Sequence, residues 1–350
     1  MKFQLLKVTV VTVLGCFPYC SLAQQPSPPP ASPRLSEPLR TTYYPEAICP
    51  GCIIPEWDRG FFLEKEIHKN PAQVTMYDAS GNKILTVNIS PPDVSDVWVL
   101  TAAAGSKGGV LAAAAGATTD GRRGFIARTD NAGRTVQWLM PEHFNTKSLC
   151  EAGDTSVWVL GQDGDAPGIH DFNNFVVRQY SFEKGLISRF VIMAQVENTQ
   201  GESNRPPAIQ KTYLRCGADR VSAFLPDSSQ YAEIDTATAT ITRWKVDMSS
   251  AVGPESRGFA VTKDLRVFVA FANSDHAHQL YELRAMSGNP VATLTPVIGM
   301  LSTVDPIDDA SKYTVTHLLG ADGNDLIVQR QGDRWGVSWV KVIPSSSPPD

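Results

Sequence analysis

The sequence has no motif that identifies a reaction. It contains no GxSxG nucleophile turn, no HExxH zinc motif, no phosphate-binding P-loop and no dinucleotide-binding glycine fingerprint. No long stretch repeats its apolar residues with the 3.6-residue period of a helix. These absences leave open whether the protein is an enzyme, and we predict neither a cofactor nor a bound metal ion.

Positive charge and long apolar runs are also scarce. The 350 residues include 31 lysines and arginines against 36 aspartates and glutamates, a formal net charge of −5. This acidic balance argues against a nucleic acid as partner. After the first 23 residues, no run is long and apolar enough to cross a bilayer, so we predict no transmembrane segment there.

Residues 1–23 have the organisation of a secretory signal peptide. Two lysines precede an apolar run at residues 8–20, and Ser-Leu-Ala follows as a small-residue cleavage signal. The sequence therefore predicts a secreted or periplasmic protein. An alternative is a lipoprotein, because Val-Leu-Gly precedes Cys16 in the manner of a lipobox whose cysteine becomes acylated.

The two ends of the remaining chain are rich in proline. Residues 24–40 include the run QQPSPPPASPRLSEP, whose prolines disfavour helix and central strand and favour an extended, disordered linker. The last residues, SSSPPD at 345–350, are predicted to be a disordered tail. We expect a single folded domain between these segments, at residues 41–344.

The chain between its ends repeats pairs of β-rich runs joined by short turns. Such hairpins begin at Val74, Phe125, Val176, Tyr231 and Leu280, at spacings of 51, 51, 55 and 49 residues, and again at Trp335. Another pair of short apolar strands lies between successive hairpins, as at residues 156–161. Four strands in about 50 residues, repeated, are typical of the blades of a β-propeller.

The tetrapeptide VWVL occurs twice, at residues 97–100 and 157–160. Its two copies are not separated by the hairpin spacing, so they do not occupy equivalent positions in the repeat. The surrounding turns place the first copy on the innermost strand of its unit and the second copy on the next strand outwards.

In its pattern of repeated strands and turns, the sequence resembles the secreted bacterial six-bladed β-propellers of the TolB-like and NHL-like group. The resemblance covers residues 57–343 through its rhythm of strands and turns, and it implies an all-β fold with four-stranded blades. Six blades are expected, and five or seven remain alternatives. Because the last unit lacks an outer strand, we expect residues 41–44 to supply it and close the ring.

We label the strands of each blade a to d from the centre outwards, so that the b–c and d–a connections share one face. The long connections all fall on this face, where a rigid scaffold usually carries its binding residues. The alternative is that these are tolerated surface insertions. The candidate binding-face residues are Arg122, Arg123, Asp163, Asp165, His170, Asp171, Arg205, His276, His278, Asp305, Asp308 and Asp309.

Four cysteines follow the leader, at Cys49, Cys52, Cys150 and Cys216. In an oxidising compartment they favour disulfides, with three possible connectivities. Cys150 and Cys216 occupy nearly matching positions on the innermost strands of adjacent units, so they can be bridged if their Cα atoms lie within about 7 Å. Cys49 and Cys52 fit a local or structural disulfide better than a redox centre.

The leading functional hypothesis is a binding or interaction module that takes a protein, a small molecule or a saccharide on its long-loop face. The resemblance implies an alternative, a metal-dependent lactonase-like hydrolase with its ion in the central channel. His276 and His278 provide two imidazoles without a third fixed ligand, so the sequence assigns no metal site. A third hypothesis is a structural role in which the proline-rich segment acts as a tether.

Overall fold

The structure is a computed structural model, and its described residues belong to one compact unit, Ser32–Ser345. It describes residues 32–36, 38–43, 56–66, 71–152, 156–164, 172–194, 211–273, 278–298, 314–331 and 336–344. The predicted leader at residues 1–23, the predicted tail at residues 345–350 and the pair Cys49 and Cys52 lie outside this set.

Consecutive strands form antiparallel sheets of four. The first sheet contains β3 (Glu56–Asp58), β4 (Phe61–Glu66), β5 (Ala72–Asp78) and β6 (Lys83–Ile89). The second contains β7 (Ser95–Ala104), β8 (Val110–Thr118), β9 (Gly121–Thr129) and β10 (Thr135–Leu139). The third contains β11 (Phe144–Ala152), β12 (Ser156–Gly164), β13 (Phe172–Ser181) and β14 (Gly185–Ala194).

The later strands follow the same antiparallel order within one larger sheet. One group contains β15 (Tyr213–Cys216), β16 (Arg220–Leu225), β17 (Gln230–Asp235) and β18 (Thr240–Val246). The next contains β19 (Glu255–Val261), β20 (Val267–Ala272), β21 (His278–Arg284) and β22 (Val291–Pro296). The last contains β23 (Thr314–Asp322), β24 (Asp325–Gln331) and β25 (Gly336–Ile343). Parallel pairings of β18 with β22 and of β19 with β23 join these groups.

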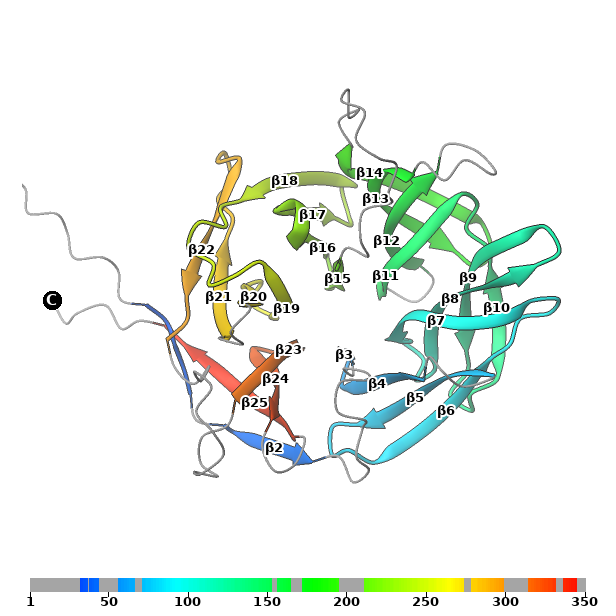
Figure 1. The fold of residues 1–350 in the computed structure, drawn as a ribbon, viewed down its shortest axis with the longest axis horizontal. Coiled ribbons are helices and arrows are strands. Elements are labelled where there is room, and N and C mark those ends of the chain that lie inside the picture. The colour runs from blue at the N-terminus through cyan, green and yellow to red at the C-terminus, as the bar shows by residue number, and fades with distance from the viewer. Residues whose placement is uncertain are drawn as a thin grey trace, which may run out of the picture. The chain divides into compact units, whose positions relative to one another are not determined.

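These groups follow one another around a central axis, with the first strand of each group innermost (Figure 1). The arrangement confirms the predicted β-propeller of four-stranded units. The two copies of VWVL lie on β7 and β12, a first and a second strand, as the turns predicted. The described residues contain a short 3₁₀ turn, Pro226–Ser228, and none of their helices has the length and hydropathy needed to span a membrane.

Strands in this fold are apolar on both faces because each sheet is covered on both sides. On β12, Trp158 and Leu160 pack into a hydrophobic cluster shared with β16, whereas Val157 and Val159 pack into a cluster shared with β8. Alternate residues of a strand point to opposite faces, so a sheet between two neighbours needs a continuous apolar run. This requirement explains why VWVL shows no alternation with polar residues.

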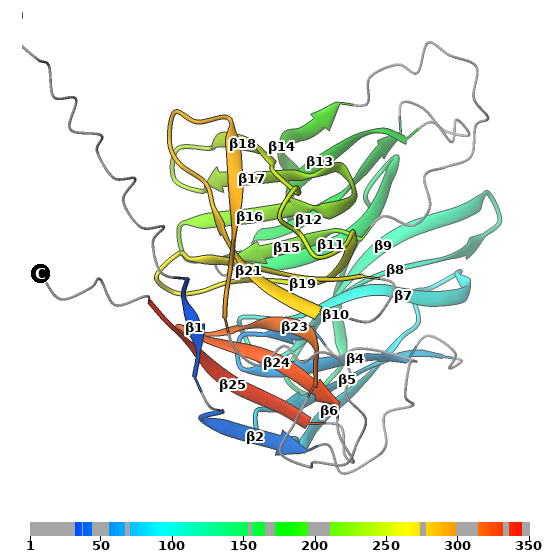
Figure 2. The same ribbon diagram turned by 60° about the vertical axis from the view of Figure 1, so that its left-hand side comes forward.

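The N-terminal segment closes the ring. β2 (Arg40–Tyr43) pairs antiparallel with β25, with Arg40 opposite Trp339, and lies beside it in Figure 2. This pairing confirms the predicted closure for residues 41–43, and residue 44 lies outside the described residues. β2 also contacts the first sheet, because Thr42 Oγ1 donates a hydrogen bond of 2.9 Å to the Ala79 carbonyl and Arg40 donates to the same oxygen.

A further strand, β1 (Arg34–Leu35), extends this closure. It pairs with β25, with Leu35 opposite Val342, and the Leu35 N–H donates to the Ile298 carbonyl at 2.9 Å. Ordered pairing therefore begins inside residues 24–40, which the proline content predicts as a disordered linker, and this corrects that boundary. The residues between Pro33 and Pro38 keep their backbone N–H groups, which is sufficient for a short edge strand.

Candidate functional site

A cavity of about 440 Å³ lies between the innermost strands β3, β7, β11, β15, β19 and β23. Most of its lining comes from the first residues of β11, β15 and β19, the strand ends reached by the d–a connections. The cavity is therefore displaced towards the face that carries the long connections. Its charged lining residues are Glu56, Lys65, Lys147, Lys211, Arg215 and Arg257, and its histidine is His317.

Breaks in strand register shape this cavity. The pairing of β7 with β8 skips Leu100, that of β11 with β12 skips Lys147, and that of β19 with β20 skips Arg257. All three residues line the cavity. A β-bulge adds one residue to a strand and changes the direction of its side chain, and bulges are common beside functional sites. Two of the cationic side chains of the cavity therefore stand on bulges.

The Lys65 ammonium is engaged on one side of the cavity. It lies 2.6 Å from a carboxylate oxygen of Glu56 and donates a second hydrogen bond of 3.1 Å to the Leu100 carbonyl. The opposite charges of Lys65 and Glu56 cancel each other. An ion pair that is partly exposed contributes little to stability, and its main effect here is to fix both side chains in the wall.

Lys211 and Arg257 share one carboxylate on the opposite side. Lys211 Nζ lies 3.6 Å from one oxygen of Glu255, and the Arg257 guanidinium lies 2.7 Å from the other. Lys211 also donates to the Ser256 carbonyl at 2.9 Å. Two cations around a single carboxylate leave one positive charge uncompensated in this part of the lining.

Arg215 projects from β15 next to the disulfide. Its guanidinium donates to the carbonyl oxygens of Leu214 at 3.0 Å and Leu319 at 3.2 Å. Its positive charge acts on Asp58, where β3 ends. Burial raises the pKa of Asp58 to about 6, and the charges of Arg215 and Arg59 and a hydrogen bond of 2.9 Å from the Ala104 N–H oppose that rise.

His317 occupies the cavity wall on β23 as a neutral imidazole. Burial lowers its pKa to about 3, and the positive charges of Arg257 and Lys211 lower it further in the same direction. Arg257 Nη1 lies 3.3 Å from His317 Nε2. Because a guanidinium can only donate, Nε2 must accept, which places the imidazole proton on Nδ1. This buried N–H has no hydrogen-bond partner among the described residues.

Lys147 is the cavity amine without a partner among the residues that the structure describes. Neither an ion pair nor a hydrogen bond of its ammonium is found among the described residues, although its side chain is half-buried. Burial lowers its pKa. The neighbouring residue on each side is fixed, since Thr146 is buried and Ser148 Oγ donates to the Thr212 carbonyl at 2.7 Å.

The described lining is strongly cationic for an acidic protein. It contains five positive side chains and one carboxylate, and adding Glu255 gives five against two, a balance of +3. Ionised Asp58 near Arg215 reduces that balance by one. The whole chain has a formal charge of −5, so the cavity has the opposite sign to the rest of the molecule. A concave site lined by one sign of charge concentrates ligands of the other sign.

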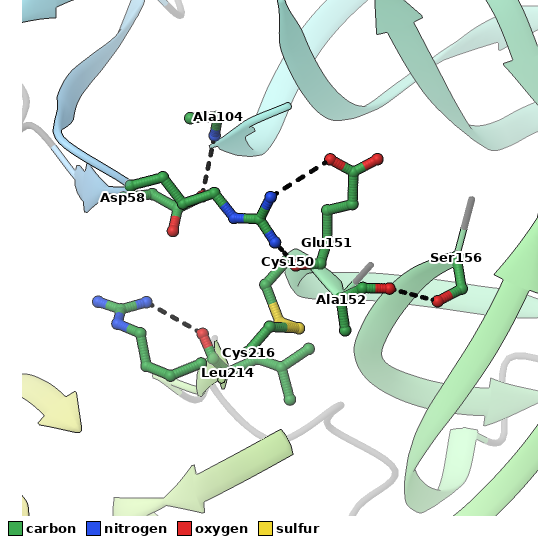
Figure 3. The surroundings of a disulfide bond; sticks show 10 residues. Asp58, Ala104, Cys150, Glu151, Ala152, Ser156, Leu214 and Cys216 are labelled. Atoms are coloured by element: carbon green, nitrogen blue, oxygen red, sulfur yellow. Dashed lines mark hydrogen bonds and ion pairs between the residues drawn. A yellow bond between two sulfur atoms is a disulfide. The ribbon is translucent and has the colours of Figure 1, made fainter. Parts of the chain in front are cut away.

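A disulfide ties two walls of the cavity together. Cys150 of β11 and Cys216 of β15 are bonded, with their Cα atoms 5.7 Å apart, which confirms the predicted pairing (Figure 3). Figure 3 also shows Asp58, Ala104 and Glu151 beside this bond. The crosslink therefore connects the strand that carries Lys147 with the strand that carries Arg215.

Four of the predicted binding-face residues are described, and they do not form one group. Arg122 stacks over the Trp98 ring at 4.4 Å, and Arg123 lies 3.0 Å from Asp120 at the exposed β8–β9 turn. Asp163 is buried on β12, where its carboxylate pairs with Arg178 at 2.6 Å and with Arg189. His278 begins β21 and is partly buried.

The other predicted binding-face residues lie outside the described residues. They are Asp165, His170, Asp171, Arg205, His276, Asp305, Asp308 and Asp309. In the sequence they fall between β12 and β13, β14 and β15, β20 and β21, and β22 and β23. Within the described part of the chain, no group of three or more His, Cys, Asp or Glu residues is placed to hold a metal ion.

The sequence prediction missed Lys147, Lys211, Arg215, Arg257 and His317. Lys147, Arg215 and Arg257 lie on the first strands of three successive units, β11, β15 and β19, and two of these strands contain several other polar residues. The prediction was based on the long connections, whereas Lys147, Arg215, Arg257 and His317 lie on inner strands and Lys211 lies just before β15.

Fold and site together define a β-propeller with a cationic central cavity. No protein-family model and no curated protein matches the sequence. A putative exported protein from Bacteroides fragilis is similar in structure, with a TM-score of 0.50 at 9% identity over 88% of this chain and 95% of that chain.

Two further solved structures show weaker similarity. A luciferin-regenerating enzyme gives a TM-score of 0.47 at 12% identity, over 88% of this chain and 97% of that chain. The β-propeller domain of Myceliophteria thermophila Cps50 gives 0.42 at 11% identity, over 91% of this chain and 90% of that chain. At such low sequence identities, structural similarity indicates a shared fold and nothing more. The fold assignment itself is based on the strand order and register of this chain.

Proposed function

We propose that this protein is a secreted, six-bladed β-propeller that binds a small organic anion in its central cavity. The observation that carries the proposal is the excess of positive charge in the described lining, in a chain that is acidic as a whole. The volume of about 440 Å³ falls in the range of small-molecule sites, roughly 300 to 1,000 Å³.

The remaining lining suits an organic ligand better than an inorganic ion. Leu100, Leu149 and Leu318 contribute apolar surface, and Tyr213 contributes an aromatic ring and a hydroxyl. Apolar walls with a few convergent polar groups are typical of sites that orient organic molecules. The ligand class is therefore a carboxylate, phosphate or sulfonate attached to an apolar body.

A divalent cation fits this lining less well. Hard cations require several oxygen ligands, and cations already present in a site repel them. The described lining offers the Glu56 carboxylate, which Lys65 already occupies. We therefore place the binding module ahead of the metal-dependent hydrolase.

The sites predicted from the connections extend this proposal. Arg122, Arg123 and the other binding-face candidates are proposed to contribute further contacts to the ligand. A leader at residues 1–23 and a mature start at Gln24 are part of the proposal, as is the proline-rich spacer before β1. A disulfide between inner strands is consistent with an oxidising compartment.

The test is a binding screen on purified mature protein. Organic anions and their neutral isosteres, such as a carboxylate and its amide, are compared by thermal shift and calorimetry at low and high salt. We expect binding of the anions that weakens with salt, and no binding of the amides. Arg257→Gln should weaken binding about tenfold, which is about 1.4 kcal/mol.

The matched control is Arg134→Gln, because the Arg134 side chain is 80% exposed at a c–d turn away from the cavity. Equal binding of acid and amide, or equal weakening by both substitutions, would overturn the proposal. Sequencing of the mature N-terminus tests secretion, since a chain that begins with acylated Cys16 would replace the soluble form by a lipoprotein.

A further inference from the structure

The cavity holds three lysines that differ in how they are engaged. Lys65 is bound by Glu56 at 2.6 Å and by the Leu100 carbonyl at 3.1 Å. Lys211 donates to the Ser256 carbonyl at 2.9 Å and lies 3.6 Å from Glu255. Lys147 has no partner among the described residues, and burial lowers its pKa.

This difference has a chemical consequence. An ammonium held by a carboxylate or a carbonyl is stabilised in its charged form, which has no lone pair for bond formation. A half-buried amine without such partners is more easily deprotonated, and desolvated lysines in pockets are the ones that act as nucleophiles towards carbonyl groups. Lys147 is therefore the most nucleophilic of the three lysines.

The position of Lys147 also favours reaction with a bound anion. It is the residue that the β11–β12 pairing skips, and it lines the cavity on the strand joined by the disulfide to the strand of Arg215. The hydrogen bond from Ser148 Oγ to the Thr212 carbonyl fixes the backbone beside it. A ligand held by the arginines lies in the same cavity as this amine.

We propose that Lys147 condenses with the carbonyl carbon of an organic anion that carries an aldehyde or keto group. This inference rests on the proposed anion binding. Neutral Nζ forms a bond to the carbonyl carbon, and the π pair of the carbonyl moves to oxygen, which takes up a proton. Nitrogen then loses a proton, which gives a neutral carbinolamine. Its hydroxyl takes up a proton and the C–O bond breaks to release water, while the nitrogen lone pair forms the C=N bond of an iminium. Loss of the remaining N–H proton gives the imine. Amine and carbonyl supply every atom, and no oxidant or reductant takes part.

The experiment traps this imine by reduction. Protein is incubated with glyoxylate or pyruvate and cyanoborohydride, and modified lysines are located by peptide mass mapping. We expect Lys147 to be labelled several-fold faster than Lys65, Lys211 and the exposed Lys83 and Lys184. Lactate, which matches pyruvate but has no carbonyl carbon open to attack by an amine, should compete for the cavity without being trapped.

Lys147→Arg keeps the positive charge and removes the reactive amine. It should abolish trapping at residue 147. The control variants Lys83→Arg and Lys184→Arg, at exposed positions outside the cavity lining, should leave both the labelling of Lys147 and the reversible binding of lactate intact. If the lysines of the wild-type protein are labelled in the order of their exposure, the inference is wrong. The peptide mapping that decides this requires no variant. If lactate and other anions bind while Lys147 stays unlabelled, the proposed imine formation is wrong and the proposed anion binding stands. If no organic anion binds, the proposed function fails as well.

Discussion

Gly258 of β19 lies directly opposite Leu318 of β23, in a parallel pairing that joins two inner strands of the ring. Residue 258 has a φ of +137°, and a Cβ added there would overlap the Leu318 carbonyl oxygen. Both residues line the cavity. A glycine at this position therefore allows the two walls to approach each other, and it follows directly after the bulged Arg257.

Gly258→Ala is expected to lower the free energy of unfolding by more than about 3 kcal/mol, because overlap with backbone adds to the strain of a positive φ. Urea denaturation measures the change. Gly288→Ala is the control, since Gly288 has a φ of +80° but no atom within 4 Å of an added Cβ, and it should cost only about 1 kcal/mol. Equal losses in both variants would show that the contact with Leu318 contributes nothing.

Loss of the disulfide should destabilise the ring and loosen the cavity. Cys150 and Cys216 are 66 residues apart in sequence, and closing a loop of that length stabilises a protein by about 4 kcal/mol in the chain-entropy model. We expect the Cys150→Ser, Cys216→Ser double variant to unfold at lower denaturant and to bind anions more weakly. The same shift should appear in wild-type protein treated with reductant, and no shift in either sample would contradict the structural role.

Asp58 should make stability fall as pH rises. Its pKa in the folded protein is about 6, above the ordinary 3.8, so its protonated form stabilises the fold at low pH and this contribution is lost between about 3.8 and 6. The loss is at most about 3 kcal/mol. Asp58→Asn removes the titration, so the difference in unfolding free energy between wild type and variant should change over this range. A constant difference from pH 4 to pH 7 would refute the assignment.

His317 should make stability fall as pH falls. Its pKa is lowered from 6.5 to about 3, so the stability that neutral His317 contributes is present above pH 6.5 and is lost as pH falls towards 3. His317→Gln should therefore lose less stability than wild type on acidification from pH 7 to pH 4, by roughly 3 kcal/mol. Thermal unfolding of the two proteins across this range provides the measurement, and parallel curves would exclude a buried neutral imidazole.

Removal of the N-terminal strands that close the ring should expose the outer edge of β25. A chain that starts at residue 44 lacks both β1 and β2, which leaves the outer backbone groups of β25 without these partners and prone to pair with other chains. We expect aggregation on size exclusion and a loss of at least about 3 kcal/mol. A chain that starts at residue 32 keeps β1 and β2 and serves as control. If both truncated chains behave like the full protein, closure of the ring by β1 and β2 is disproved.

The fold could be predicted because its turns are local. Asp130 accepts hydrogen bonds from the N–H groups of Ala132 and Arg134, and Asp235 accepts from those of Ala237 and Thr238. Such turns depend on residues a few positions apart, so their spacing shows the repeat in the sequence. The closing strand was also predictable from the sequence. The last unit shows three strands where the other units have four, so a segment from elsewhere in the chain has to supply the fourth.

The cavity could not be predicted in the same way. Lys147 and Arg257 point into it because strand register breaks beside them, and a break of one residue reverses the alternation on which sequence patterns depend. The neutral state of His317 also depends on Arg257, 60 residues away in the sequence. These relationships exist only after the sheets have assembled.

The pairing of β2 with β25 has a consequence for biosynthesis. Thr41 and Ser338 share a hydrogen bond of 2.9 Å although 297 residues separate them. A nascent chain emerges from its N-terminus, so β2 stays without its partner until the last strand has been made, and contacts between such distant residues form slowly. A chain terminated early, before residue 336, cannot complete the ring, so closure distinguishes finished molecules from unfinished ones.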